Sequence, residues 1–325
     1  MHWIWFAVGI LLAGPKPAPI RRIRLNMQLL KAFFALVVLW PACTQTATAQ
    51  TVYGALGSEG EPDRMQQWRV PSPDADIGAH AVLYRPPGEG PFRLAVIAHA
   101  STENVLRRVQ TPQPEYHALA AWLVKRGFAV LVPERPGHGA TGGRYLEDQG
   151  GCDEADYSRA GRATADSIVT ALNYLRGQSF IRQDGAVVLG HSAGAWGALA
   201  LAHENPPGVS GIIAFAPGRG GHANDFPNQI CAPHTLVSMA GEFGKGAHVP
   251  VTWLVAANDT YFSPTLSRQL ADAFRGGGGK VDFHVLAASG SEGHWLAETE
   301  AGVKIAGPEL DRALEPLAAT AAKKR

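Results

Sequence analysis

Apolar runs of strand length recur along the chain from residue 79 onward, and stretches with helical periodicity separate them. The runs that predict strands are His80–Tyr84, Leu94–His99, Ala129–Pro133, Ala186–Leu189, Gly211–Ala216, Val251–Ala256 and Val281–Leu286. The helical patterns are Tyr116–Arg126, Ala160–Arg176, Ala193–Ala202, Pro264–Phe274 and Glu309–Ala322. Because helix follows strand almost throughout, the pattern predicts an α/β fold. We expect a mostly parallel sheet of about eight strands with helices on both faces.

Three stretches depart from this alternation. Residues 50–78 are rich in Pro, Asp and Gly, so we expect an irregular arm with one antiparallel edge strand. Pro136–Tyr157 and Gly218–Pro250 are polar, rich in glycine and longer than a strand-to-helix connection needs. We predict that both form loops over a functional site; the alternative is that they are ordinary solvent loops.

The first 49 residues resemble an export signal. Met27–Lys31 is a short basic segment, Ala32–Trp40 is apolar but too short to span a bilayer, and Ala47–Ala49 is an A-x-A cleavage signal. We therefore predict an upstream extension and signal peptide over 1–49, with Met27 as the true start, and a single catalytic domain over 50–325. A long two-part signal, an N-terminal anchor and a lipoprotein acylated at Cys43 are the alternatives.

Removing this leader changes the charge and leaves two cysteines. The whole chain carries 29 basic and 28 acidic residues, and 24 and 28 remain after residue 49, a net charge of −4. No basic region suited to nucleic acid remains. An exported protein meets an oxidising periplasmic or extracellular environment, so we expect Cys152 and Cys231 to form a disulfide, with two free buried thiols as the alternative.

The candidate nucleophile lies in G-H-S-A-G at residues 190–194, between an apolar run and an alanine-rich helical pattern. A strand that ends at a serine and turns at once into a helix places that side chain on a strained, accessible turn. Ser192 is therefore our candidate nucleophile. A glycine-serine turn without chemistry is the alternative.

A serine needs a general base and an acid that orients the base, in the chain order serine, acid, histidine. His294 follows the last predicted strand in a glycine-containing loop, and Asp259 directly follows an earlier strand. Asp225, Glu242, Asp272 and Asp282 also lie between Ser192 and His294 but in less suitable positions. For the oxyanion we expect two backbone N–H donors, those of Ala193 and Ser101.

These residues resemble the α/β-hydrolases, in particular the secreted serine hydrolases similar to dienelactone hydrolase. The resemblance covers about residues 79–325 and rests on His99, R-P-G-H-G at 135–139, G-H-S-A-G at 190–194, Asn258-Asp259 and Gly293-His294. It implies a Ser192–Asp259–His294 triad and an oxyanion hole at Ser101 and Ala193. Many relatives have His-Gly where this chain has His99-Ala100, and true dienelactone hydrolases use a cysteine nucleophile.

The expected reaction is two-step acyl transfer through an acyl-enzyme, without metal or organic cofactor. A carboxylic ester is the leading substrate class. A peptidase or amidase on the same fold and a non-catalytic binding protein are the alternatives. We expect His191, Trp196, Tyr261 and Phe262 to line the substrate pocket. The expected partner is a small-molecule or ester substrate; we expect no nucleic acid, no stable membrane insertion after signal cleavage, and a monomer or small homo-oligomer.

Overall fold

The computed structural model describes residues 51–322, with side chains to residue 315. The predicted leader, including Met27 and Cys43, lies outside these residues. Within them, no helix has both the length and the apolar character that crossing a membrane requires.

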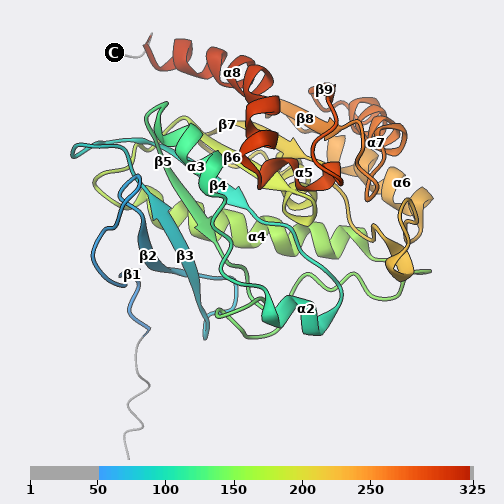
Figure 1. Ribbon diagram of the computed structural model, residues 1–325, viewed down its shortest axis with the longest axis horizontal. Helices are drawn as coiled ribbons and strands as arrows, with labels where there is room; N and C mark the ends of the chain where they lie inside the picture. Colours follow the sequence, from blue (N-terminus) through green and yellow to red (C-terminus); the bar gives the residue numbers. More distant parts are fainter. Residues whose placement is uncertain (1–50, 323–325) are drawn as a thin grey trace, which may run out of the picture. The chain divides into compact units, whose positions relative to one another are not determined.

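Nine strands form one sheet in the order β1-β2-β3-β5-β4-β6-β7-β8-β9 (Figure 1). Neighbours from β1 to β5 run antiparallel, and every pair from β5 to β9 is parallel. This confirms the mostly parallel sheet, with one strand more than expected. The strands are β1 Gly54–Ala55, β2 Gln66–Pro71, β3 Gly78–Tyr84, β4 Arg93–Ala98, β5 Phe128–Pro133, β6 Ala186–His191, β7 Val209–Phe215, β8 Val251–Ala256 and β9 Val281–Leu286.

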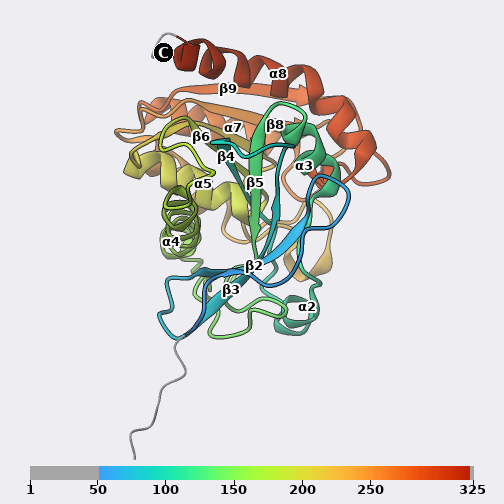
Figure 2. The same ribbon diagram turned by 90° about the vertical axis from the view of Figure 1, so that its left-hand side faces the viewer.

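Helices cover both faces of this sheet, as Figures 1 and 2 show for α4 and α8. Alternate residues of β6 divide between two cores: Val188 packs with α4, α5, α6 and α7, and Val187 packs with α3 and α8. Strand periodicity therefore produces both apolar layers, because successive side chains point to opposite faces. The helices are α2 Val105–Gln110, α3 His117–Val124, α4 Tyr157–Arg176, α5 Ala193–Glu204, α6 Pro233–Gly244, α7 Pro264–Gly276 and α8 Glu300–Ala322.

Two of the predicted irregular stretches contain regular structure. Gly218–Pro250 was expected to be a loop, but residues 233–244 form α6, which buries Leu236, Ala240 and Phe243 at helical spacing. Its glycines and polar flanks obscure that short pattern. The arm contains two strands, β1 and β2, rather than one.

Two further helices differ from the prediction. The last one begins at residue 300 rather than at Glu309, because packing of Val303 and Ala306 against the sheet outweighs the helix-breaking tendency of Pro308. The short helix α2 follows β4 and was not predicted. It lies near the carboxyl ends of the central strands, where the candidate site also lies.

Candidate active site

Ser192 lies on a strained turn between β6 and α5. Its φ of 55° and ψ of −118° place it in a region that non-glycine residues rarely adopt. The backbone N–H of Ser192 donates to Phe215 O on the neighbouring strand at 2.9 Å, which holds the turn. A Cβ at Gly190 would lie 2.4 Å from Ala195 Cα, and one at Gly194 would lie 2.1 Å from Ala98 O. Both glycines of the motif are therefore required by close backbone packing.

Asp259 and His294 form a buried pair at the ends of two other segments. Asp259 follows β8, and His294 lies in the short 3-10 helix η2, Gly293–Ala297. Their Oδ2 and Nδ1 atoms are 3.1 Å apart, and Asp259 Oδ1 accepts the backbone N–H groups of Tyr261 and Phe262 at 2.8 Å each. The carboxylate is thus fixed by two donors while its other oxygen orients the imidazole with Nε2 left to act as base.

The His294 imidazole is suited to accepting a proton. Burial lowers its pKa below the usual 6.5, and the hydrogen bond to Asp259 opposes this shift. The ring is therefore neutral at neutral pH. Within residues 51–322, neither Ser192 Oγ nor His294 Nε2 makes a hydrogen bond, to the other or to any further group. Catalytic hydrogen bonds are often formed only when substrate is bound.

Ser192 and His294 open into the same cavity, which has a volume of about 880 Å³. Ser101 and Ala193, the predicted oxyanion residues, also line it, as do Tyr261 and Phe262, which were expected in the substrate pocket. Cys152 and Cys231 lie in its wall and form a disulfide that joins the two long stretches on either side. The structure therefore brings the predicted nucleophile, base and oxyanion residues to one cavity at the carboxyl edge of the sheet.

Two residues predicted for the pocket lie outside it. Trp196 is fully buried in the core, where it packs on Phe243 and donates to Tyr157 O at 2.9 Å. The helix α5 points this side chain away from the turn and toward α4 and α6. His191 is also fully buried, because its strand position directs it behind the nucleophile instead of into the cavity.

Two backbone N–H groups at the cavity are the candidate donors to an oxyanion. Within the described residues, the N–H groups of Ala193 and Ser101 donate to no protein acceptor, although both residues line the cavity. Ala193 is the first residue of α5, where the helix dipole favours negative charge. The neighbouring Ala100 N–H donates to Tyr116 Oη at 3.2 Å, whereas the Ser101 N–H has no protein acceptor.

Comparisons with known proteins agree with this fold. A family model described as serine aminopeptidase, S33, matches residues 113–245, which include Ser192 but end before Asp259 and His294. Among solved structures, an esterase of Pyrococcus furiosus, Pf2001, aligns with a TM-score of 0.54 at 11% identity, covering 78% of this chain and 92% of its own. The chain has the α/β-hydrolase fold. No curated protein matches it.

Two further solved structures share the fold of this chain. Est1E of Butyrivibrio proteoclasticus, solved with bound ferulic acid, aligns with a TM-score of 0.54 at 15% identity over 77% of this chain and 99% of its own. A cold-adapted esterase from an Arctic intertidal metagenomic library aligns with a TM-score of 0.52 at 18% identity over 81% and 100%. At such identities the similarity shows a shared fold and does not identify the substrate of this protein.

Several residues that support the site were not found from the sequence. His138 Nε2 is 2.7 Å from Ser101 Oγ, and its Nδ1 faces the carbonyl oxygen of Arg135 at 3.1 Å. Since a carbonyl only accepts, Nδ1 carries the proton and Nε2 accepts from the Ser101 hydroxyl. Burial lowers the pKa of His138 to about 4, so this neutral form persists at neutral pH. The motif R-P-G-H-G at 135–139 was the available signal.

A buried charge cluster supports the wall that carries Ser101. Glu147 pairs with Arg135 and Arg219, and Arg219 also donates to Glu103 Oε1 at 2.9 Å. Burial alone would raise the pKa of Glu147, but the two guanidinium groups outweigh it and hold the pKa well below the usual range. These partners lie far apart in sequence, so no local pattern indicated the cluster.

Glu292 connects the acid and base segments of the site. Its Oε1 accepts the backbone N–H groups of Thr260 and His294 at 3.0 Å each, and its Oε2 accepts from the Thr260 hydroxyl. The His294 ring stacks on Tyr261 with centroids 4.2 Å apart, and Tyr261 stacks in turn on His222 at 3.5 Å. The imidazole is therefore held both along its ring plane and across its face.

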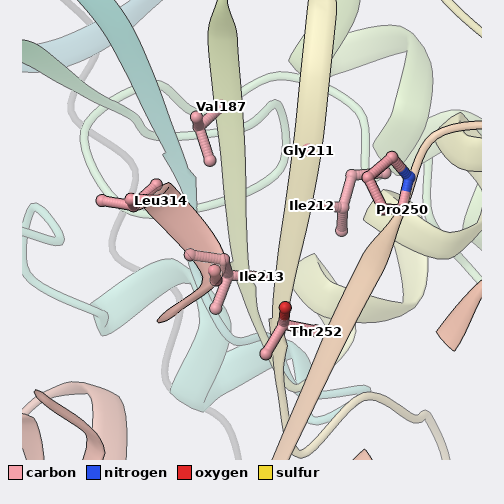
Figure 3. Close-up of a pocket in the computed structure, with 8 residues that line it drawn as sticks. Val187, Gly211, Ile212, Ile213, Pro250, Thr252 and Leu314 are labelled. Carbon is pink, nitrogen blue, oxygen red and sulfur yellow. The ribbon is translucent and has the colours of Figure 1, made fainter. Parts of the chain in front are cut away.

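A second, small cavity lies at the amino edge of the sheet, opposite the candidate active site (Figure 3). It measures about 30 Å³ and lies where β6, β7 and β8 begin, against α8. Ile213 and Leu314 are among its aliphatic lining residues. That space holds about one water molecule, so it is a packing defect and not a ligand site. Across residues 51–322, no three His, Cys, Asp or Glu residues are grouped to hold a metal ion.

Proposed function

We propose that this α/β-hydrolase cleaves carboxylic esters through an acyl-enzyme on Ser192. The observation that carries the proposal is the buried Asp259–His294 pair, which opens into the same cavity as the strained Ser192. Ser192 attacks the carbonyl carbon while His294 Nε2 takes the hydroxyl proton, and Asp259 stabilises the imidazolium. The N–H groups of Ala193 and Ser101 hold the oxyanion, and the protonated His294 then donates to the departing alcohol.

Water completes the cycle by the same groups. His294 removes a proton from water, the hydroxide attacks the acyl carbon, and the carboxylic acid leaves as Ser192 regains its proton. The cavity of about 880 Å³ has room for a small or medium-sized ester with its acyl and alcohol parts both enclosed. The two esterases that share the fold support esters as the substrate class.

A peptidase or amidase is the second candidate, because the matching family model is described as a serine aminopeptidase. The two candidates differ in the leaving group. Turnover of short p-nitrophenyl esters should exceed turnover of aminoacyl p-nitroanilides, since the alcohol departs more easily than the amine. A preference for the anilides would replace our proposal by the peptidase.

A fluorophosphonate probe tests the nucleophile directly. The wild-type protein should be labelled and Ser192→Ala should not. Ser167→Ala is a matched control, because Ser167 is a buried serine of α4 whose hydroxyl donates within its own helix. Folded wild-type protein that resists labelling would favour the non-catalytic binding protein.

We also propose that the enzyme acts after export, in the periplasm or outside the cell. The Cys152–Cys231 disulfide supports this, because disulfides persist mainly in oxidising compartments. Sequencing the N-terminus of the mature protein tests it. A start near Gln50 is expected, and retention of residues 27–49 in the mature protein would contradict cleavage.

A further inference from the structure

Tyr116 connects to the loop that carries one oxyanion donor. Its side chain is buried, and its φ of 51° is unusual for a bulky residue. The Tyr116 hydroxyl oxygen accepts the Ala100 N–H at 3.2 Å, directly before Ser101. This bond orients the peptide that precedes the Ser101 N–H.

His191 connects the same tyrosine to the catalytic base. The carbonyl oxygen of His294 lies 2.8 Å from His191 Nε2, so that nitrogen carries a proton and donates it. The other nitrogen, Nδ1, lies 3.0 Å from Tyr116 Oη and 3.1 Å from Glu298 Oε1. His191 is therefore in contact with the backbone of the base on one side and with Tyr116 and Glu298 on the other.

Glu298 supplies the charge of this group. Its Oε1 accepts from the Tyr116 hydroxyl at 3.3 Å, and its side chain is partly exposed at the cavity. Burial raises the pKa of Glu298, but its hydrogen bond and charge interaction with His191 lower it by more. The carboxylate is thus ionised at neutral pH and accepts the proton of the Tyr116 hydroxyl.

We infer that Tyr116, His191 and Glu298 form a positioning bridge that holds the oxyanion loop and the base loop in register. The inference rests on the proposed function. The chain of contacts runs from Ala100 through Tyr116 and His191 to His294, with Glu298 accepting at its centre. It joins a loop after β4 to the segment after β9, on either side of Ser192.

The bridge should act mainly in the transition state. Oxyanion donors strengthen their bonds only when negative charge develops on the carbonyl oxygen, whereas ground-state binding depends on the cavity walls. A small misplacement of donor or base therefore lowers kcat more than it raises KM. A purely structural role for the three residues would lower folding stability without this split.

Tyr116→Phe tests the bridge, with Tyr84→Phe as its matched control. Tyr84 is similarly buried, and its hydroxyl also makes two polar contacts, to Glu115 O and His117 Nδ1 on either side of Tyr116. Neither contact is a hydrogen bond of the bridge, so the control removes a buried hydroxyl and leaves the bridge bonds in place. With a short p-nitrophenyl ester, Tyr116→Phe should lower kcat about 10- to 100-fold and change KM less than about twofold. Tyr84→Phe should retain wild-type kcat at a comparable loss of thermal stability.

A double-mutant cycle tests whether the residues act as one unit. Glu298→Ala should lower kcat, and Glu298→Gln should lower it less, because the amide oxygen of glutamine still accepts a hydrogen bond. The double variant Tyr116→Phe with Glu298→Ala should lose much less kcat than the product of the two single losses. Multiplicative losses, or a Tyr116→Phe kcat equal to that of Tyr84→Phe, would overturn the inference.

The labelling rate of Ser192 by the fluorophosphonate separates this result from the proposed function. If the wild type is labelled and active but Tyr116→Phe reacts as fast as Tyr84→Phe, only the bridge is wrong. If folded wild type is neither labelled nor active on esters, the proposed function fails and the bridge with it.

Discussion

The conformation of Ser192 depends on Gly190 and Gly194, which lie two positions before and two positions after it in the sequence. Its φ and ψ are unfavourable, and the turn persists only because α5 packs directly on β4 and β6. The main-chain carbonyl oxygen of Ala98 lies so close to Gly194 that no side chain fits between them. Ser192 is therefore held in its conformation by backbone packing that only glycines permit at positions 190 and 194.

Gly194→Ala should accordingly destabilise the protein and disrupt the active site. The new Cβ would fall 2.1 Å from Ala98 O, so a backbone must move, at a cost of about 3 kcal/mol or more in the free energy of unfolding. Urea unfolding and fluorophosphonate labelling measure both effects. Gly151→Ala is the control, since open space surrounds that position. Equal stability of the two variants would contradict the packing argument.

The protonation of His294, which is paired with Asp259, leads us to a prediction about the pH dependence of kcat/KM. Only the neutral imidazole can accept the Ser192 proton, and its pKa is lowered below 6.5. The value of kcat/KM should therefore be constant at neutral pH and fall as the pH decreases through a midpoint below 6.5. A midpoint above 6.5 would show that burial does not dominate at His294.

Asp259→Asn should lower kcat about 10³- to 10⁴-fold, because an amide no longer fixes the required tautomer or stabilises the imidazolium. It should also move the acid midpoint to lower pH, because the carboxylate raises the pKa of His294. Asp272→Asn is the control, since Asp272 is exposed on α7 and pairs with Arg275. Activity of Asp259→Asn near that of the control would remove Asp259 from the proposed triad.

At the scale of elements, the sequence was informative where structure is local. The apolar strands, the serine turn, and the positions of Asp259 and His294 just after strands are each visible over a few residues. The structure places these ends at one edge of the sheet. The helix α6 was missed because its apolar positions lie among glycines. Tyr116 and Glu298 are 182 residues apart, and only the folded topology brings them together.

The disulfide connects two stretches of the cavity wall that the Glu147–Arg219 ion pair also joins. Cys152 and Cys231 close a loop with a sequence separation of 79. In the chain-entropy model, removing such a link costs about 4 kcal/mol of unfolding free energy. The double variant Cys152→Ser with Cys231→Ser should therefore unfold at lower urea concentration, and dithiothreitol should shift the wild type in the same direction. A midpoint that neither change alters would indicate that the wall is stable without the bridge.

For the whole molecule, buried histidines near the cavity link folding to pH. Burial lowers the pKa of His138 to about 4 and holds that of His99 well below its usual value. Unfolded histidine titrates near pH 6.5, so between these values the unfolded chain binds more protons than the folded one. The stability that a neutral histidine contributes is thus complete above about pH 6.5 and is lost as the pH falls toward 4.

His138→Gln should reduce this acid sensitivity. Protonation of the unfolded state at His138 alone lowers the wild-type unfolding free energy by about 3 kcal/mol between pH 7 and pH 4, and the variant lacks that term. Urea unfolding at pH 7, 5.5 and 4 measures the slope. His248→Gln serves as the control, because it also replaces a histidine by glutamine but at a position exposed to solvent. If His138→Gln and His248→Gln lose stability equally on acidification, the buried Ser101–His138 contact is not the source of the pH dependence. His99 and the charge cluster around Glu147 would then have to account for it.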